Sequence, residues 1–380
     1  MPSLDGSQLM GIDRKSSMTC ISPFVQLAPN HVSICNLDAI RVIYAHGNGT
    51  TKSDFYDAFF EVRHNILSTQ EPYIHQHVAE FLEQWDKLCE GGKNVCSGTE
   101  GEGGWQGRLG RVWFNCMPWY NYWAVDVIGN LAFGSPFDIV RNARDVLLQQ
   151  WTSTTLWPTM EIPAVKMLTD QAESPPSLGA LPPWIRPLVL RLPCEASHIS
   201  DGSARHFEPR QDEEGRPMSR EELTEEAFAQ LIAGSDTISK QLFLCDNIAA
   251  NPQMQAKLQK ELDEALGVDS CEDPVPTYDQ VKNLRHLEAV INEGMRLHST
   301  VGLLRVVPEG GVTVYGKSFP EGTVLSIPMY TVHRVPEVWG ADADIFRPER
   351  WFERDPVKLQ KSFHPFSFGP GYLYAMHPPT

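Results

Sequence analysis

The stretch 233–237, "AGSDT", places a carboxyl and a hydroxyl group side by side in a segment that contains no proline from Ser219 to Asn251. The capping pair Ser219 and Glu222 opens this segment, which therefore predicts a long, largely buried helix. Gly234 and the hydroxyl residues weaken helix formation, so a local kink is expected. An acid and a hydroxyl at a kink suit proton delivery. Taken alone, the stretch is better explained by a glycine tolerated for close helix packing.

Glu293 and Arg296, in "EGMR", are three residues apart and would share one face of a helix. A carboxylate and a guanidinium at this spacing can form a bidentate ion pair. Most such spacings are surface pairs worth about 0.3–0.5 kcal/mol. Downstream, "FRPERW" offers Arg347 and Arg350 in a segment fixed by proline, and the Phe/Gly-rich loop "HPFSFGPG" follows it. The order of these stretches is more informative than any one of them.

Helices dominate the predicted secondary structure, and small sheets are secondary. Helical spacing and caps predict helices over residues 38–47, 71–91, 117–134, 219–251, 252–266 and 277–298. The runs "PFVQL" and "HVSI" predict one hairpin, and "GVTVYG" with "GTVLSIP" predict another. The segment 91–107 is rich in glycine and poor in apolar residues, which predicts a flexible surface loop.

Composition excludes several classes of function. The 380 residues are 42% hydrophobic, enough for a sizeable core, and the formal net charge of -16 argues against a nucleic-acid partner. Such acidity fits a soluble enzyme or one at a membrane surface. The eight cysteines contain no CxxC pair, so neither a zinc ribbon nor a disulfide framework is predicted. The first thirty residues hold no apolar run for a signal peptide or membrane span, which predicts a cytoplasmic chain.

In this order and at these separations the motifs resemble a cytochrome P450: AGxDT on the central helix, ExxR on a later helix, a PERF-like segment and a PFSxGPR-type loop. The stretches "YAHGNGTTKSDFYDAF" and "LQKELDEAL" look most like the fungal benzoate 4-monooxygenase group. The resemblance implies a mainly α fold with small β-sheets, formed by one domain over residues 1–380. It also implies haem b, a small aromatic carboxylic acid such as benzoate hydroxylated at the para position, dioxygen, and electrons from NADPH–cytochrome P450 reductase. The implied location is the cytosolic face of the endoplasmic reticulum membrane.

Residue by residue, the resemblance assigns roles to two groups of positions. On the dioxygen side, Ala233 and Gly234 would line the groove above the haem, and Asp236 with Thr237 would deliver protons. The remaining assignments form a structural triad, Glu293, Arg296 and Arg350, and a cofactor-binding set, Arg305, His333, Phe366 and Gly369. Arg305 matches an arginine that binds a haem propionate. For His333, a propionate contact and an ordinary core histidine are both open.

The sequence departs from the family pattern at the haem ligand. Where the pattern has arginine, one variable residue and the ligand cysteine, this chain has Gly371, Tyr372 and Leu373, and no cysteine follows Cys271. No metal ligand is therefore assigned. A membrane anchor, the helix with a haem-propionate pair and the helix after the cysteine are also not found. These gaps suggest a truncated or mis-spliced gene product and an incomplete fold.

Three hypotheses follow from the sequence. The first is a haem-thiolate monooxygenase acting on a small aromatic acid. The second is a haem-less remnant of such an enzyme without catalytic activity. The third is a non-catalytic helical module that binds a small molecule or a protein partner.

Overall fold

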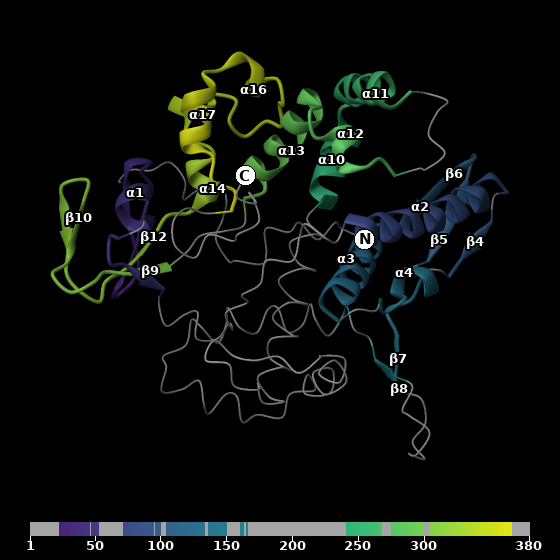
Figure 1. The fold of residues 1–380 in the computed structure, drawn as a ribbon, viewed down its shortest axis with the longest axis horizontal. Coiled ribbons are helices and arrows are strands. Elements are labelled where there is room, and N and C mark those ends of the chain that lie inside the picture. The colour runs from purple at the N-terminus through teal and green to yellow at the C-terminus, as the bar shows by residue number, and fades with distance from the viewer. Residues whose placement is uncertain are drawn as a thin grey trace. The chain divides into compact units, whose positions relative to one another are not determined.

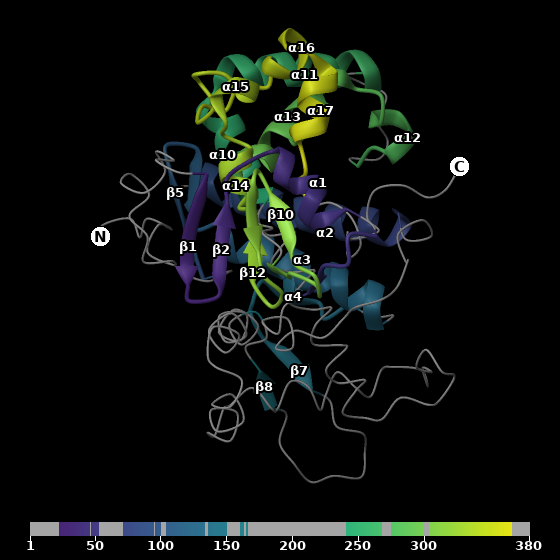
Figure 2. The ribbon, with the colours of Figure 1, turned by 90° about the vertical axis from the view of Figure 1, so that its left-hand side faces the viewer.

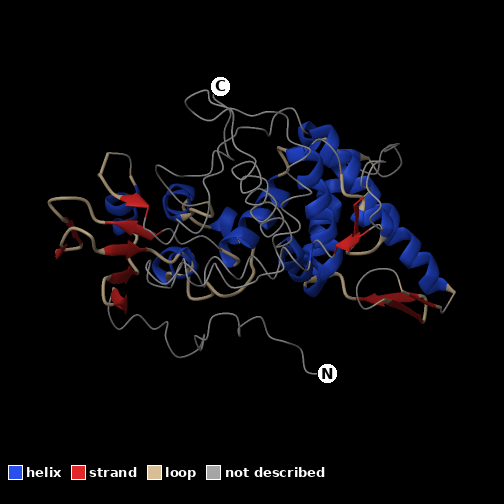
Figure 3. Ribbon diagram, turned by 90° about the horizontal axis from the view of Figure 1, so that it is seen from below, coloured by secondary structure: helices blue, strands red, loops and turns tan. Residues whose placement is uncertain are grey.

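The computed structural model describes residues 23–45, 47–52, 71–94, 96–99, 104–133, 136–149, 160–162, 165, 241–267, 275–299 and 304–366. The stretch 233–237, Gly369 and Leu373 lie outside these described residues. Helices account for most of the regular structure and the sheets are small, so the predicted mainly α class is confirmed (Figures 1 and 3). The chain divides into two units, which are described in turn: Met1–Ser53 with Ala289–Met376, and Asp54–Glu288 with His377–Thr380.

The first unit contains a five-stranded sheet in the order β1-β2-β12-β9-β3. The strands are β1 (Phe24–Ala28), β2 (His31–Ile34), β3 (Thr51–Lys52), β9 (Leu304–Val306) and β12 (Val324–Ser326). β1 pairs with β2 in the antiparallel sense, which confirms the first predicted hairpin. β12 lies beside β2 and runs parallel to it, with Leu325 opposite Val32 (Figure 2). The sheet thus joins segments from opposite ends of the sequence.

The core of this unit lies between the sheet and helix α1 (Asp38–Tyr44). Ile40, Ile43 and Tyr44 are buried on one face of the helix, as the spacing predicts. The Tyr44 hydroxyl accepts a hydrogen bond of 3.0 Å from the backbone N–H of Ile327, which follows β12. Packing and a buried polar contact therefore both fix α1 to the sheet.

The second predicted hairpin is wrong in its pairing. β10 (Val312–Val314) pairs with β11 (Lys317–Phe319), whereas β12 pairs with β9 and β2. Tyr315 and Gly316 join β10 to β11 with φ values of 49° and 74°. Two consecutive positive φ values make the tight turn whose twist matches paired strands. Tyrosine is an unusual residue in such a turn, so these two positions are not a clear turn signal.

The segment predicted as one helix over residues 277–298 forms two helices, α12 (Tyr278–Val281) and α13 (Arg285–Leu297). Thr277 and Gln280 form a capping box at the start of α12. The carboxylate of Glu261 accepts hydrogen bonds of 2.9 Å from the backbone N–H groups of His286 and Leu287. A carboxylate at this position satisfies free N–H groups of a first turn, so a new helix starts here.

The other helices of the first unit are short and follow the sheet in the sequence. They are α14 (Met329–Val332), α15 (Pro336–Trp339), α16 (Arg350–Glu353) and α17 (Pro356–Ser362). Pro336 and Pro356 stand in the first turns of α15 and α17, where proline loses no hydrogen bond. Trp339, buried completely, packs with Leu359 and Phe363 in a small core of their own.

The second unit is built around two longer helices, α2 (Glu71–Lys93) and α3 (Met117–Phe133). Trp119 and Tyr122 of α3 are buried and belong to the core of this unit. The unit also contains α4 (Ile139–Asn142), α10 (Gln241–Ala250), α11 (Pro252–Leu266), β4 (Ser97–Gly98), β5 (Trp105–Arg108), β6 (Arg111–Phe114), β7 (Leu147–Gln149) and β8 (Met160–Ile162). The side chain of Asn251 caps α11 by accepting a hydrogen bond from the backbone N–H of Met254. Among the described residues, no helix is long and apolar enough to cross a membrane.

The prediction of a flexible loop over residues 91–107 is wrong for the part that the structure describes. α2 continues to Lys93, and β4 and β5 belong to a three-stranded sheet with β6. A Cβ atom on Gly91 would overlap the Trp105 ring, and a Cβ atom on Gly107 would lie 2.7 Å from Cα of Gly92. These glycines therefore allow a helix and a sheet to approach closely, which composition alone cannot distinguish from flexibility.

Candidate functional site: a buried carboxylate between two arginines

Glu293 and Arg296 lie on the buried face of α13, one turn apart. Both side chains are completely buried. The Arg296 guanidinium donates from Nε to Oε2 of Glu293 and from Nη2 to Oε1, each at 2.9 Å. The pair is therefore bidentate, as the spacing allowed, and it belongs to the interior and not to the surface.

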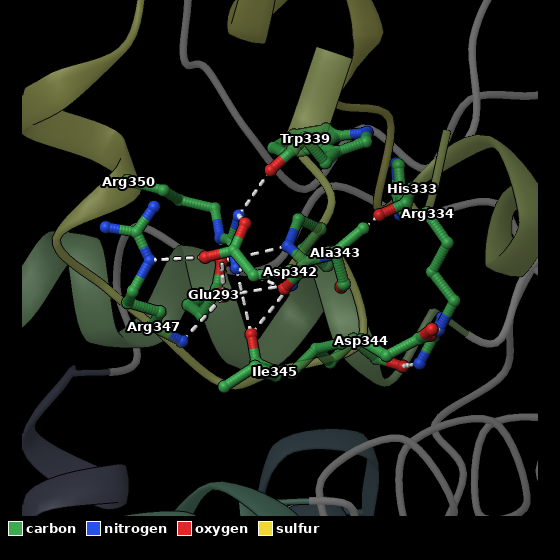
Figure 4. A network of polar contacts seen from close by, with 12 residues as sticks. Glu293, His333, Arg334, Trp339, Asp342, Ala343, Asp344, Ile345, Arg347 and Arg350 are labelled. Carbon is green, nitrogen blue, oxygen red and sulfur yellow. Dashed lines mark hydrogen bonds and ion pairs between the residues drawn. The ribbon is translucent and has the colours of Figure 1, made fainter. Parts of the chain in front are cut away.

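Arg350, the first residue of α16, brings a second guanidinium to the same carboxylate. Its Nε donates to Oε1 of Glu293 at 2.8 Å, and its side chain is also completely buried. The backbone N–H of Arg347 donates to Oε1 at 2.9 Å, and the indole N–H of Trp351 donates to Oε2 at 3.1 Å. Figure 4 shows Glu293 and Arg350 within this polar network. The carboxylate thus accepts hydrogen bonds from two guanidiniums, one backbone group and one indole.

Backbone carbonyls accept most of the remaining hydrogen bonds of both guanidiniums, and Oδ1 of Asp342 accepts one from Arg350 Nη1 at 3.2 Å. Arg296 Nη1 donates to the carbonyls of His333 and Ala343, at 2.6 and 2.7 Å. Arg350 donates to carbonyls at 2.5 to 2.9 Å; the acceptors are Trp339, Asp342 and Ile345. Two guanidiniums against one carboxylate leave an excess positive charge, and oriented carbonyl dipoles offset it. The segment 333–345 is thereby wrapped around the two arginines.

A second layer of ion pairs lies toward solvent. The Arg347 side chain donates from Nε to Oδ2 of Asp342 at 2.6 Å and contacts Oε2 of Glu353 at 2.5 Å. Desolvation raises the pKa of Asp342, but the hydrogen bonds and charges of Arg347 and Arg350 outweigh it and hold this pKa below its usual value. Asp342 is ionised at neutral pH and joins the buried pair to the surface.

His333 is completely buried and packs against the rings of Trp339 and Phe363, with centroids 5.9 and 5.5 Å away. Its Nε2 accepts a hydrogen bond of 3.0 Å from the backbone N–H of His364. Burial, and then the charges of His364 and Arg296, lower the pKa of His333 to about 3. His333 is therefore neutral near pH 7, and its Nδ1 has no hydrogen-bond partner among the described residues. Its predicted contact with a haem propionate stays a prediction.

The structure describes two more of the sequence-predicted site residues. Arg305 lies in β9, is almost fully buried, and has its guanidinium carbon 5.9 Å from the centroid of the Tyr44 ring. Phe366 is half-buried and is the last described residue of the chain. Ala233, Gly234, Asp236, Thr237 and Gly369 lie outside the described residues, so their predicted roles stay predictions. The structure therefore brings Glu293, Arg296 and Arg350 together, with His333 beside them.

Sequence reasoning missed several members of this network. Trp351 directly follows Arg350 in "PERW", which was a usable signal, because an indole N–H needs an acceptor when it is buried. Asp342 and the carbonyls of residues 333–345 had no comparable signal. A backbone carbonyl is common to every residue type, so its role depends on the path of the chain.

Comparisons with known proteins show the family of this chain. Residues 196–371 match the family model described as Cytochrome P450. Benzoate 4-monooxygenase bphA of Aspergillus niger is 34% identical over 414 aligned residues, which cover 91% of this chain and 75% of that protein. This chain belongs to the cytochrome P450 family. The proteins of this family are haem-dependent monooxygenases.

Other fungal P450 relatives match at lower identity. Cytochrome P450 monooxygenase FCK2 of Fusarium pseudograminearum is 29% identical over 91% of this chain and 64% of its own length. Pisatin demethylase of Fusarium vanettenii is 27% identical over 93% of this chain and 73% of its own length. The span of 414 positions aligned with bphA is longer than the 380 residues of this chain, so some positions in that span have no counterpart here.

The family implies a haem, whose iron needs a ligand atom from the protein. The residues of this P450 chain that could supply such an atom are considered in turn. The described cysteines are Cys35, Cys89, Cys96, Cys116 and Cys245. The described residues contain no group of three or more His, Cys, Asp or Glu residues that could hold a metal ion. By the motif order in the sequence, Leu373 stands where the family pattern has its ligand cysteine; this residue lies beyond the matched range 196–371 and outside the described residues. The predicted absence of a thiolate ligand stays a prediction.

Proposed function

We propose that this P450 chain carries the frame of an aromatic-acid monooxygenase. The reaction belonging to that frame is para-hydroxylation of a small aromatic carboxylic acid such as benzoate. Dioxygen is the oxidant, and NADPH–cytochrome P450 reductase supplies the electrons. The observation that carries this proposal is the 34% identity over 91% of the chain with a protein named for benzoate 4-hydroxylation.

The frame itself consists of Glu293, Arg296 and Arg350 with the segment 333–345. This network ties α13 to the chain that leads through His364 into "PFSFGPG". A buried carboxylate fully hydrogen-bonded between two guanidiniums holds its surroundings in one geometry, and loss of one partner leaves a buried charge uncompensated. We assign this network to positioning the loop. Two further proposed roles require bound haem. They are proton delivery by Asp236 and Thr237, and a propionate contact by Arg305.

Leu373 favours a second candidate function for the chain as it stands. Without a sulfur donor at this position, the chain keeps the P450 frame but holds no thiolate-ligated haem and catalyses no hydroxylation. Such a chain can still bind a small aromatic acid or a protein partner without chemistry. The two candidates differ in one measurable property, the ligation of haem.

The deciding experiment is the reduced carbon-monoxide difference spectrum of the purified chain supplied with haem. The thiolate-type Soret band would contradict the second candidate, and its absence would support it. The double variant Gly371→Arg with Leu373→Cys restores the family pattern in the loop. We expect this variant to gain the thiolate-type band, and the matched variant Gly371→Arg with Leu373→Ser to lack it.

The substrate is tested separately, in the restored variant with reductase and NADPH. Conversion of benzoate to 4-hydroxybenzoate supports the aromatic-acid frame. A restored variant that shows the thiolate-type band but leaves benzoate unchanged would contradict the substrate while keeping the frame. Calorimetric titration of the unaltered chain with benzoate tests the non-catalytic alternative, because heat of binding without haem would support it.

A further inference from the structure

A hairpin in the second unit holds a leucine out into solvent at its tip. β5 and β6 pair in the antiparallel sense, and Leu109 and Gly110 form the two-residue turn between them. The φ values of these residues are 53° and 71°, in the left-handed region. Asn, Asp or Gly take this conformation readily, whereas leucine does so at a free-energy cost. The Leu109 side chain is 86% exposed, so packing within the described residues does not offset this conformational free energy.

The register of the hairpin separates its two faces. Trp105 pairs with Phe114, and Gly107 pairs with Val112; this face packs against the C-terminal part of α2. Figure 1 shows the hairpin beside α2. The opposite face carries the alternate positions, because side chains alternate along a strand. Its members are Gln106, Arg108, Arg111 and Trp113, all of which are exposed.

This outer face concentrates positive charge and an aromatic ring. Arg108 and Arg111 stand directly opposite each other, a like-charge pair that weakens a hairpin on its own. Within the described residues neither guanidinium has an ion-pair partner. Glu100 and Glu102 precede the hairpin in the sequence and lie outside the described residues. Trp113 is 64% exposed on the same face.

We propose that the tip of the β5–β6 hairpin docks on an anionic lipid surface. In the docked state Leu109 enters the boundary between headgroups and acyl chains, Trp113 lies at the headgroup level, and Arg108 and Arg111 contact lipid phosphates. Leucine and tryptophan gain free energy on transfer to that boundary, and arginine near an anionic surface adds an electrostatic contribution. This assignment does not depend on haem or on the proposed function.

The shape and charge of the tip favour a bilayer over a protein partner. A protruding leucine needs a preformed pocket on a protein, whereas a fluid headgroup layer accepts a convex apolar tip. The chain has a net charge of -16, so it is repelled as a whole from an anionic surface. Arg108 and Arg111, beside the exposed Leu109, therefore make the tip locally positive although the chain as a whole is negative.

Flotation of the full-length chain with vesicles tests this proposal. We expect the chain to float with vesicles of phosphatidylcholine containing phosphatidylserine, and to float much less with phosphatidylcholine alone or at high salt. Each of Arg108→Gln and Arg111→Gln is expected to lower partitioning about fivefold. Leu109→Asn is expected to lower it roughly tenfold. Asparagine suits the left-handed turn, so this variant keeps or increases the stability of the hairpin.

The matched control is Tyr315→Asn in the β10–β11 turn. Tyr315 has a φ of 49° and is also a largely exposed residue in a two-residue turn, but no arginine pair flanks it. Its variant should float like the unaltered chain. The proposal is overturned if the unaltered chain does not float with anionic vesicles. It is also overturned if the Leu109→Asn variant floats as well as the unaltered chain. Loss of flotation in Tyr315→Asn as well, or self-association through the hairpin in sedimentation without lipid, would overturn it equally.

Discussion

The backbone N–H of His364 donates a hydrogen bond to Nε2 of His333, and the carbonyl of the same His333 accepts one from Arg296. A ring nitrogen can accept a hydrogen bond only when it carries no proton. The contact therefore makes the position of the chain entering "PFSFGPG" depend on a neutral imidazole. His364, Arg296 and Arg334 are the charged or titratable groups that act on this ring.

Acid should destabilise the protein through His333. Burial lowers the pKa of His333 from 6.5 to about 3. Below pH 6.5 this histidine is therefore protonated in the unfolded chain, whereas it stays neutral in the folded chain. The resulting stability is fully present above pH 6.5 and is lost as the pH falls toward 3. Between pH 7 and pH 5 we expect a loss of about 2 kcal/mol from this residue. Urea unfolding at both pH values measures it.

The variant His333→Gln isolates this contribution, because an amide oxygen can still accept from His364 but does not titrate. We expect the unfolding free energy of this variant to change less between pH 7 and pH 5 than that of the unaltered chain. Equal changes in the two proteins would refute the assignment to His333. The pKa of His364 is also lowered by burial, but His364 is present in both proteins.

Glu293→Gln should be among the most destabilising single substitutions in the described residues. Glutamine has one oxygen where the carboxylate has two and cannot offset two buried guanidiniums. Removing one partner of a buried ion pair typically costs about 3–5 kcal/mol, and chemical denaturation should show a loss of this order. Asp344→Asn is the control, because Asp344 pairs with Arg334 at an exposed position and should cost under about 1 kcal/mol. Similar losses in both variants would contradict a special role for the buried site.

Asp126 should respond to pH in the opposite sense to His333. Its buried carboxylate accepts hydrogen bonds from the backbone N–H groups of Phe137, Ile139 and Val140, yet desolvation still raises its pKa to about 6. The folded state thus favours the protonated form. The associated stability is present below pH 3.8 and is lost as the pH rises through 6, by roughly 2–3 kcal/mol.

Hydrogen exchange in Asp126→Asn tests this geometry. Oδ1 accepts from Phe137 and Ile139, and an amide oxygen can replace it there. Oδ2 accepts from Val140, where the amide NH2 group would instead face another donor. We expect the Val140 amide to exchange faster in the variant while that of Ile139 changes little. Uniform acceleration at both amides would mean that the whole turn opens, contrary to the prediction.

Gly91→Ala should destabilise the protein although it replaces a glycine within a helix. Alanine usually stabilises a helix interior by about 1 kcal/mol relative to glycine. Here the new methyl group would overlap the Trp105 ring, and overpacking typically costs about 1–3 kcal/mol. A net loss of up to roughly 2 kcal/mol in thermal or urea unfolding is expected. Glu90→Ala, at an exposed position of the same helix, should stay within about 0.5 kcal/mol; a stabilised Gly91→Ala protein would exclude close packing.

Local patterns in the sequence were enough for contacts made within one element. The spacing of Glu293 and Arg296 predicted their ion pair, and the cap at Asn251 and the first hairpin were equally visible. Contacts that depend on the path of the backbone were not visible. Two examples depend on how distant segments meet. Backbone carbonyls accept hydrogen bonds from Arg296 and Arg350, and glycines leave room for the Trp105 ring. The predicted relay at Asp236 and Thr237 lies outside the described residues.

The parallel pairing of β2 with β12 has a consequence for the synthesis of this chain. Nε2 of His31 and the hydroxyl of Ser326 lie 2.8 Å apart although 295 positions separate them in the sequence. At typical rates of translation the ribosome needs roughly 15–60 s to add that many residues. During this time the β1–β2 hairpin has left the ribosome with the edge of β2 unpaired. A nascent chain is therefore open to other strands or to chaperones until its last quarter has been translated.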